Sequence, residues 1–184
     1  QIMQRFFAGI NSFVLTAVPL FLLAGNIMNS GKITDKLIDL SSAMVGHIRG
    51  GLAHINVLVS LLFGGISGSA VADTSGVGTI LIPAMIKKGY STRFSVVVTS
   101  ASSVLGQIIP PSLIMIIYSA SAGVSVQAMF LAGIIPGILL ALTMMIISYV
   151  YAIKYDYPKE EKKSIKEFLI AFKKSFLVLL MPII

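Results

Sequence analysis

Residues 64–73, Gly-Gly-Ile-Ser-Gly-Ser-Ala-Val-Ala-Asp, and residues 106–112, Gly-Gln-Ile-Ile-Pro-Pro-Ser, each interrupt a long apolar run. Lipid offers no water to hydrogen-bond a freed backbone group, so a membrane-spanning helix normally avoids such breaks. Breaks that do occur at membrane depth usually line a cavity, and in secondary transporters that cavity holds the ion and the substrate. The two stretches therefore predict a membrane protein that transports a solute.

The composition excludes a soluble domain. Of the 184 residues, 56% are hydrophobic and 11% are charged, and no charged residue or histidine occurs from Phe94 to Ile153. A soluble domain cannot cover its surface without charge over such a length, whereas membrane crossings require its absence. The net charge of +7 comes from Lys and Arg clusters beside apolar runs, which is typical of cytoplasmic membrane loops and not of a nucleic-acid-binding surface.

Hydrophobic periodicity predicts an all-α integral membrane protein. Residues 1–50 are expected to form a scaffold helix (Phe6–Met28) and an interfacial amphipathic helix, residues 51–128 a transport-domain hairpin and a broken helix, residues 129–157 a transmembrane helix, residues 158–175 a second amphipathic interfacial helix, and residues 176–184 the start of the next transmembrane segment. The chain starts without Met and stops inside that apolar run, so we expect it to be a piece of a longer protein.

The first break predicts a re-entrant helical hairpin. The apolar arms Leu52–Ile66 and Gly76–Ile86 are each too short to cross a bilayer alone, and residues 67–69 form the tip between them. The hairpin begins after Arg49 and ends at a basic cluster that starts at Lys87, so the positive-inside rule places both ends in the cytoplasm.

The second break predicts a broken transmembrane helix. Its first half is Phe94–Gly106, and Pro110 and Pro111 lack the N–H that a regular helix needs. Ser112 suits the N-cap of a second half that runs to about Tyr118. The segment Phe130–Ile153 is the clearest complete span in the chain.

Both breaks combine hydroxyl groups with backbone carbonyls, the oxygen ligands that hard cations such as sodium prefer. Glycine and serine at such positions also let helices pack closely, and that explanation stays open. Asp73 is the only acid between Asp39 and Asp156. It is a candidate functional carboxylate or a cap of the second hairpin helix, and the two roles are compatible. Thr99 and Ser103 are possible ligands, although such hydroxyls often bond to their own helix.

The sequence offers no basis for an enzyme. A serine nucleophile would need a His or Lys base at membrane depth, and neither residue occurs near the breaks. There is no P-loop pattern, so ATP hydrolysis by this chain is excluded. Cysteine is absent, which excludes disulfides and thiolate metal sites, and we expect no cofactor other than coupling sodium ions.

A set of motifs resembles a known family. In order, they are Phe-Gly-Gly-Ile-Ser-Gly-Ser-Ala-Val-Ala-Asp at 63–73, Ile-Pro-Ala-Met at 82–85, Lys-Gly-Tyr at 88–90, Ile-Ile-Pro-Pro-Ser at 108–112 and Phe-Leu-Ala-Gly-Ile-Ile-Pro-Gly at 130–137. Together they resemble the large membrane subunit (the DctM-like, or M, subunit) of tripartite ATP-independent periplasmic (TRAP) transporters. The resemblance extends from about Gln4 to Pro158.

The resemblance implies an elevator-type fold with two inverted repeats, of which this chain is most of the first. It also implies sodium-driven import of organic acids such as a dicarboxylate or sialic acid across the bacterial inner membrane. The implied partners are a small membrane subunit, a periplasmic substrate-binding protein, the organic-acid substrate and the lipid bilayer.

The resemblance also implies a sodium site, carried over by motif. Its ligands would be Ser67, Ser69, Gly106, Ile109 and Pro111, and its supporting or possible ligands Gly68, Asp73, Thr99, Ser103, Gln107 and Ser112. One departure is that Gln107 stands where many members are expected to have proline.

Two alternatives remain at this stage. A passive channel or pore-forming subunit would use the breaks to shape its pore. A purely structural membrane subunit would use them for packing alone. Sodium-dependent accumulation separates transport from both.

Overall fold

The computed structural model describes residues 19–20, 23 and 33–180, and in this part of the chain the regular structure is helical throughout. The helices are α3 (Ile33–Val45), α4 (Gly51–Ser67), α5 (Ala70–Lys87), α6 (Thr92–Ser103), α7 (Leu105–Ile108), α8 (Leu113–Ala122), α9 (Val126–Lys154) and α10 (Ile165–Leu180). The all-α class is confirmed for these residues. Most of the predicted scaffold span Phe6–Met28 lies outside the described residues.

The helices α4 and α5 form the two arms of the predicted hairpin. Gly68 ends α4 in the left-handed conformation (φ 58°), and its N–H donates to the Gly64 carbonyl at 2.9 Å. Ser69 then caps α5 by accepting from the Ala72 N–H at 3.4 Å. The prediction that the second arm begins at Gly76 was wrong, because the Ser69 cap starts the helix at Ala70 and the tip is a two-residue turn.

The broken helix is formed by α6, α7 and α8. The segments Thr92–Ile108 and Leu113–Ala122 meet at an angle of 42° across the break, and the Pro110–Pro111 peptide bond is cis. Ser112 caps α8 as predicted and accepts from the Met115 N–H at 3.4 Å. The second half extends beyond the predicted Tyr118 to Ala122, where Gly123 ends it at φ 67°.

The long helix α9 matches the predicted complete span but starts four residues earlier, at Val126, because Ser125 caps it. Within the described residues, α9 is the one helix that is long and apolar enough to cross a membrane alone. If the bent pair around the Pro110–Pro111 break is counted as one span, the described residues contain two possible membrane spans.

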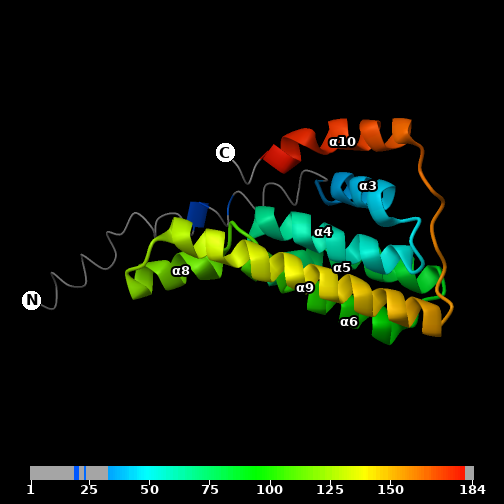
Figure 1. Cartoon of the computed structure of the whole chain (residues 1–184), viewed down its shortest axis with the longest axis horizontal. Helices are drawn as coiled ribbons and strands as arrows, with labels where there is room; N and C mark the ends of the chain where they lie inside the picture. Colours follow the sequence, from blue (N-terminus) through cyan, green and yellow to red (C-terminus); the bar gives the residue numbers. More distant parts are fainter. Residues whose placement is uncertain (1–18, 21–22, 24–32, 181–184) are drawn as a thin grey trace, which may run out of the picture.

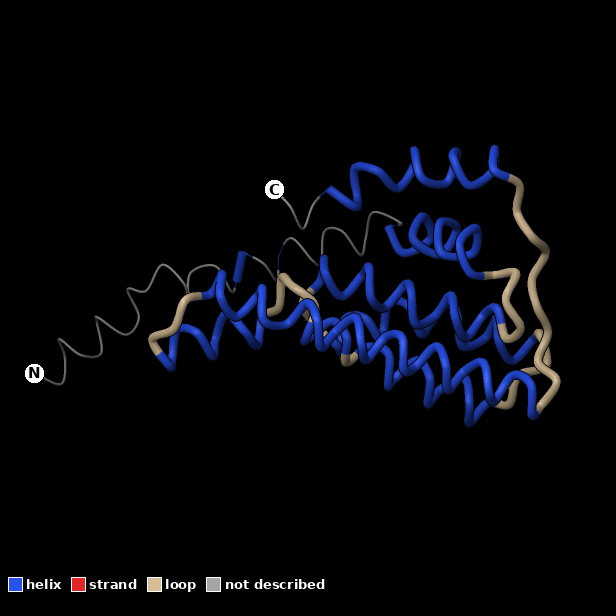
Figure 2. Tube along the Cα trace, viewed as in Figure 1, coloured by secondary structure: helices blue, strands red, loops and turns tan. Residues whose placement is uncertain are grey.

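The helices form a bundle with a second layer on one side (Figure 1). The elements α4, α5, α6 and α9 run alongside one another, whereas α3 packs against α4 and α10 packs against α3 (Figures 1 and 2). Leu37 and Leu40 of α3 are buried, and α10 buries Ala171, Ser175 and Val178. Each predicted amphipathic segment contains a helix. The helix α10 continues across residue 175, where a segment boundary was predicted.

Large apolar side chains lie on the outer side of α10. Ile165, Leu169 and Phe172 are exposed, while the small residues on the opposite side pack toward α3, where the Ser175 hydroxyl donates to the Lys36 carbonyl at 3.0 Å. The helix therefore keeps an uncovered apolar face, which suits an interfacial helix.

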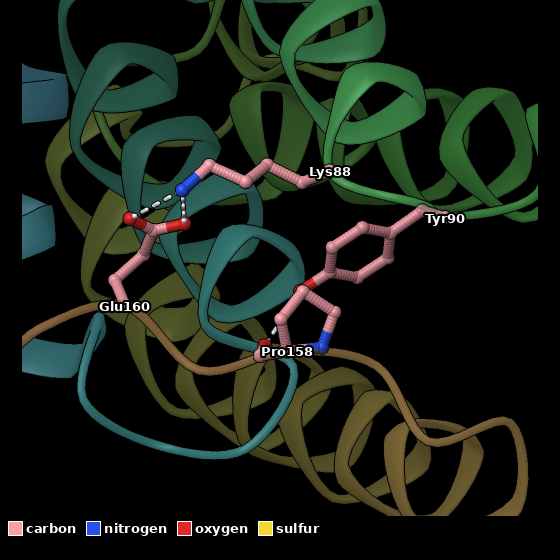
Figure 3. Close-up of polar contacts among 4 residues, drawn as sticks. All are labelled: Lys88, Tyr90, Pro158 and Glu160. Atoms are coloured by element: carbon pink, nitrogen blue, oxygen red, sulfur yellow. Dashed lines mark hydrogen bonds and ion pairs between the residues drawn. The ribbon is translucent and has the colours of Figure 1, made fainter.

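The loop after α9 joins the ends of several helices (Figure 3). The Tyr90 hydroxyl donates to the Pro158 carbonyl at 3.3 Å, and Lys88 Nζ lies 3.3 Å from Glu160 Oε1. The Gly50 N–H also donates to Pro158, at 3.1 Å. Burial raises the pKa of the Tyr90 phenol, so it stays protonated and keeps donating at neutral pH.

Ser164 and Glu167 form a capping box at the start of α10, from which a pH dependence follows. The Ser164 N–H donates to Glu167 Oε2 at 2.7 Å. The hydrogen bonds from the Ser164 backbone and side chain hold the pKa of Glu167 below its ordinary value. A lowered folded-state pKa means that the stabilisation is present at neutral pH and is lost as the pH falls through that pKa.

We expect Glu167→Ala to speed amide hydrogen exchange at Ser164 several-fold at neutral pH, and Glu161→Ala to leave it unchanged. Equal exchange in the two variants would contradict this role.

Candidate functional site

The two breaks lie against each other, and a pair of glycines makes this possible. A Cβ atom added at Gly64 of α4 would collide with the Gly106 backbone, and one added at Gly106 would lie 3.1 Å from the Gly64 Cα. The helices α4 and α7 therefore touch through their backbones. The Leu113 N–H donates to the Gly68 carbonyl at 3.4 Å and links the hairpin tip to the start of α8.

The helix α9 packs against the second break through two further glycines. A Cβ at Gly133 would lie 2.5 Å from the Ile108 carbonyl oxygen and 2.5 Å from Met115 Cε, and one at Gly137 would collide with the Ile109 side chain. The two glycines are four residues apart and share one face of the helix. This face holds the broken segment in place from the side.

The place where the hairpin tip (residues 67–69) meets the second break (residues 106–112) is called the crossing. Its polar atoms come from both breaks. At the hairpin tip, the Ser69 N–H donates to Ser67 Oγ at 3.3 Å. At the second break, the Ser112 hydroxyl donates to the Gln107 carbonyl at 2.6 Å. Ser67 and Ser112 are buried, and Ser69 is partly buried. The crossing therefore joins two helix C-terminal ends, with their carbonyl groups, to two helix N-terminal ends.

Most of the residues predicted for a sodium site come together here. Around the crossing of the two breaks the structure gathers Ser67, Gly68, Ser69, Gly106, Gln107, Ile109, Pro111 and Ser112. Thr99 lies elsewhere, on the side of α6 that faces α4, and its hydroxyl donates to the Ser95 carbonyl at 2.8 Å. Ser103 lies between these places and accepts from the Thr74 hydroxyl at 2.7 Å.

Asp73 lies in the first turn of α5 and is completely buried. It is not the cap of that helix, a role that Ser69 fills. Neither carboxylate oxygen has a partner at full hydrogen-bond geometry among the described residues, although the Ser60 side chain of α4 lies close enough to act on the carboxyl group. A buried carboxylate without a partner is costly, so this position favours a bound proton or a nearby cation. Asp73 is therefore not the N-cap of α5, but its place in the first turn still allows a favourable interaction with the helix dipole.

A buried polar network that the sequence analysis missed connects α4 to α6. Asn56 Nδ2 donates to Thr99 Oγ1 at 2.6 Å, and the Ser102 hydroxyl donates to Asn56 Oδ1 at 3.2 Å. The Ser60 and Ser102 hydroxyl oxygens lie 2.9 Å apart. The signal available in the sequence was a single asparagine in the apolar run Leu52–Ile66.

The chemistry of this region is that of neutral oxygen ligands with one buried acid. No group of three or more His, Cys, Asp or Glu side chains suitable for a metal ion occurs among residues 19–20, 23 and 33–180. Backbone carbonyls and hydroxyls suit an alkali or alkaline-earth cation better than a transition metal. A broken helix whose ends meet the ends of other helices is an arrangement that ion-coupled transporters use.

Comparison with known proteins gives the family. The model of the tripartite ATP-independent periplasmic transporter DctM component matches residues 1–184. The chain is 48% identical to the uncharacterized protein YgiK of Salmonella typhimurium, and 41% identical to the sialic acid TRAP transporter large permease protein SiaM of Vibrio cholerae. Each of these alignments covers 98% of this chain and 42% of the relative.

A third relative is the C4-dicarboxylate TRAP transporter large permease protein DctM of Pseudomonas aeruginosa, which is 40% identical over 94% of this chain and 40% of its own length. The chain thus spans less than half the length of the curated relatives it matches. It belongs to the DctM family of TRAP transporter large permease components. The resemblance stated from the motifs is confirmed.

The glycine contact between the breaks predicts a strong effect of small substitutions. We expect Gly64→Ala and Gly106→Ala each to destabilise the permease by about 1–3 kcal/mol, because the added methyl group has to separate two backbones. Gly78→Ala is the matched control, since its Cβ would lie 3.4 Å from the nearest atoms, the side chains of Ile82 and Thr99. Chemical unfolding of the purified permease measures the difference. Equal stability of Gly64→Ala and Gly78→Ala would show that the contact is not tight.

The polar network between α4 and α6 predicts a smaller effect. We expect Asn56→Ala to lower the unfolding free energy by about 1–2 kcal/mol, because it removes a partner from both Thr99 and Ser102. Thr79→Ala serves as the control, since the Thr79 hydroxyl is exposed and bonds only to the Gly76 carbonyl of its own helix. The same unfolding measurement applies, and an Asn56→Ala variant as stable as the control would mean that the network contributes nothing.

Proposed function

We propose that this chain is part of the membrane subunit of a sodium-coupled secondary transporter that imports an organic acid. The observation that carries the proposal is the crossing of the two breaks, which brings serine hydroxyls, helix-end carbonyls and a buried acid into one region. Relatives named for sialic acid and for C4-dicarboxylates support a carboxylate as the substrate.

The proposed sodium ion lies at the crossing. Ser67 and Ser69 supply hydroxyl or carbonyl oxygens from the hairpin tip, and the backbone from Gly106 to Pro111 supplies carbonyls from the second break. Gln107 and Ser112 already share a hydrogen bond and so shape that backbone. Thr99 does not belong to this ligand set, because its hydroxyl accepts from Asn56 and donates to the Ser95 carbonyl, away from the crossing.

Asp73 is proposed to favour the bound cation through charge. Its carboxylate is buried close to the hairpin tip, one turn after the Ser69 cap. A negative charge in a low-dielectric site attracts a cation over several ångströms. A bound sodium ion would in turn offset the cost of burying the carboxylate, so occupancy of the site and ionisation of Asp73 are expected to be coupled.

The proposal includes the wider assembly. The protein crosses the bacterial inner membrane several times and works with a small membrane subunit and a periplasmic binding protein that delivers the substrate. The hairpin and the broken helix belong to a moving transport domain, and an elevator-type displacement gives alternating access. The segment from Phe94 to Ile153 contains no cation, so the group that binds the substrate carboxylate is expected outside this chain.

Transport by the complete complex in proteoliposomes tests the proposal. The binding protein is loaded with sialic acid or a C4-dicarboxylate outside the vesicles, and uptake is followed with and without an inward sodium gradient. We expect accumulation only with the gradient, and at least tenfold slower uptake for Ser69→Ala and for Asp73→Asn. Ser75→Ala is the matched control, because its exposed hydroxyl bonds back to the Val71 carbonyl and should leave uptake unchanged.

The alternative function, a passive pore, predicts a different result. Downhill flux of the same size with and without sodium would exclude coupled transport and support the pore. Sodium-driven accumulation that survives Ser69→Ala would keep the transporter but move the ion away from the hairpin tip.

A further inference from the structure

A groove between α6 and α9 lies apart from the crossing of the two breaks. It is a cavity of about 680 Å³ whose walls include Val97 and Ala101 of α6 and Leu140, Met144 and Ile147 of α9. These side chains are apolar, and the wall residues on α9 extend along the helix in successive turns. The groove is therefore long and open, and it suits an alkyl chain better than a compact polar solute.

One end of the groove is polar and cationic. Ser91 and Arg93 at the start of α6 line this end, together with the tyrosines Tyr151, Tyr155 and Tyr157. Arg93 is exposed and forms no ion pair within the part of the chain that the structure describes, and the lining contains no carboxylate. Arg93 therefore places an exposed charge in the lining of the groove that no carboxylate of the described residues neutralises.

The tyrosines at this end form a rigid aromatic cluster. The rings of Phe94 and Tyr151 lie 5.5 Å apart, and those of Tyr151 and Tyr155 lie 5.7 Å apart. The Tyr157 hydroxyl donates to Ser91 Oγ at 3.3 Å and fixes the cluster to the start of α6. Aromatic side chains with one apolar and one polar end gather where a membrane protein meets the headgroup layer.

The dimensions of the groove match one leaflet of a bilayer. From Leu140 to Tyr151 the axis of α9 rises by about 16 Å, at about 1.5 Å per residue. The hydrocarbon core of a membrane is about 30 Å thick, so this length is about half of it. A lipid whose headgroup lies at Arg93 would place its acyl chain along the apolar walls and end it near the bilayer midplane.

We propose that the groove between α6 and α9 binds one anionic phospholipid of the cytoplasmic leaflet. Its phosphate lies at the Arg93 guanidinium, within reach of the Ser91 and tyrosine hydroxyls, and one acyl chain lies along Val97, Ala101 and Met144. Guanidinium and phosphate form strong charge-assisted hydrogen bonds, whereas a zwitterionic headgroup also brings a positive charge to the same place. The site rests on the proposed location in the membrane but not on sodium coupling.

Lipid retention by the intact permease complex tests this site. The complex is purified in a neutral detergent, depleted of lipid, and titrated with phosphatidylglycerol or phosphatidylcholine, with bound lipid counted by native mass spectrometry. We expect one tightly held phosphatidylglycerol per permease and at least tenfold weaker binding of phosphatidylcholine. Arg93→Gln should weaken phosphatidylglycerol binding about tenfold, and Ala101→Trp should abolish it by filling the channel.

The controls separate this lipid from other occupants. Lys87→Gln removes a charge near the same end of the bundle but outside the groove, and should leave binding unchanged. Soluble glycerol 3-phosphate should not compete, because it lacks the acyl chain. Equal retention by wild type and Arg93→Gln would overturn the proposal. Retention unaffected by Ala101→Trp would overturn it too, since the lipid would then lie outside the groove. The measurement uses no sodium gradient, so its outcome is independent of transport.

Discussion

The backbone contact between Gly64 and Gly106 is the constraint on which the rest of the site depends. Two helices normally lie 8–10 Å apart because their side chains separate them. Here neither helix has a side chain at the point of contact, so the hairpin tip and the second break lie in direct contact. The ends of four helices then converge, and polar groups more than 35 residues apart in the sequence reach one region. A side chain at Gly64 would force the breaks apart, and one at Gly106 would require a smaller shift of the Gly64 backbone.

One face of α4 explains how the helices converge. Asn56, Ser60 and Gly64 follow one another at intervals of four residues and so lie on one side of the helix. They meet Thr99, Ser102 and Gly106 on the opposing segment, with hydrogen bonds at the first two levels and backbone contact at the third. Side-chain size thus decreases toward the tip, while hydrogen bonds fix the register where the helices are wider apart. The polar network therefore aligns the crossing without contributing ligands to it.

Local signals in the sequence were sufficient for the hairpin, the second break and the Ser112 cap, because glycine, proline and serine act on the backbone next to them. They failed where two local signals competed. The second arm was expected to start at Gly76, but Ser69 caps α5 seven residues earlier and the helix continues through Gly76 and Gly78. The Asn56 network could not be predicted, since its partners are 43 and 46 residues away and only the fold brings them together. The sodium ligands and the segment boundaries inferred from the sequence stay predictions.

The directions of the helices bear on how a cation would be selected at the crossing. The C-terminal ends of α4 and α7 present carbonyl oxygens and favour a cation, whereas the N-terminal ends of α5 and α8 favour an anion. Because the two kinds of helix end lie side by side, their fields largely offset each other, and the helix dipoles alone do not favour either charge. In the proposed site, the preference for a cation would then come from Asp73, the one buried acid among the described residues, and selectivity would depend on how many oxygens the two breaks bring within reach. Since those oxygens belong to separate backbone segments, the proposed ligand set would be complete only while the hairpin tip touches the second break. Ion binding and the packing of the two breaks are therefore expected to stabilise each other.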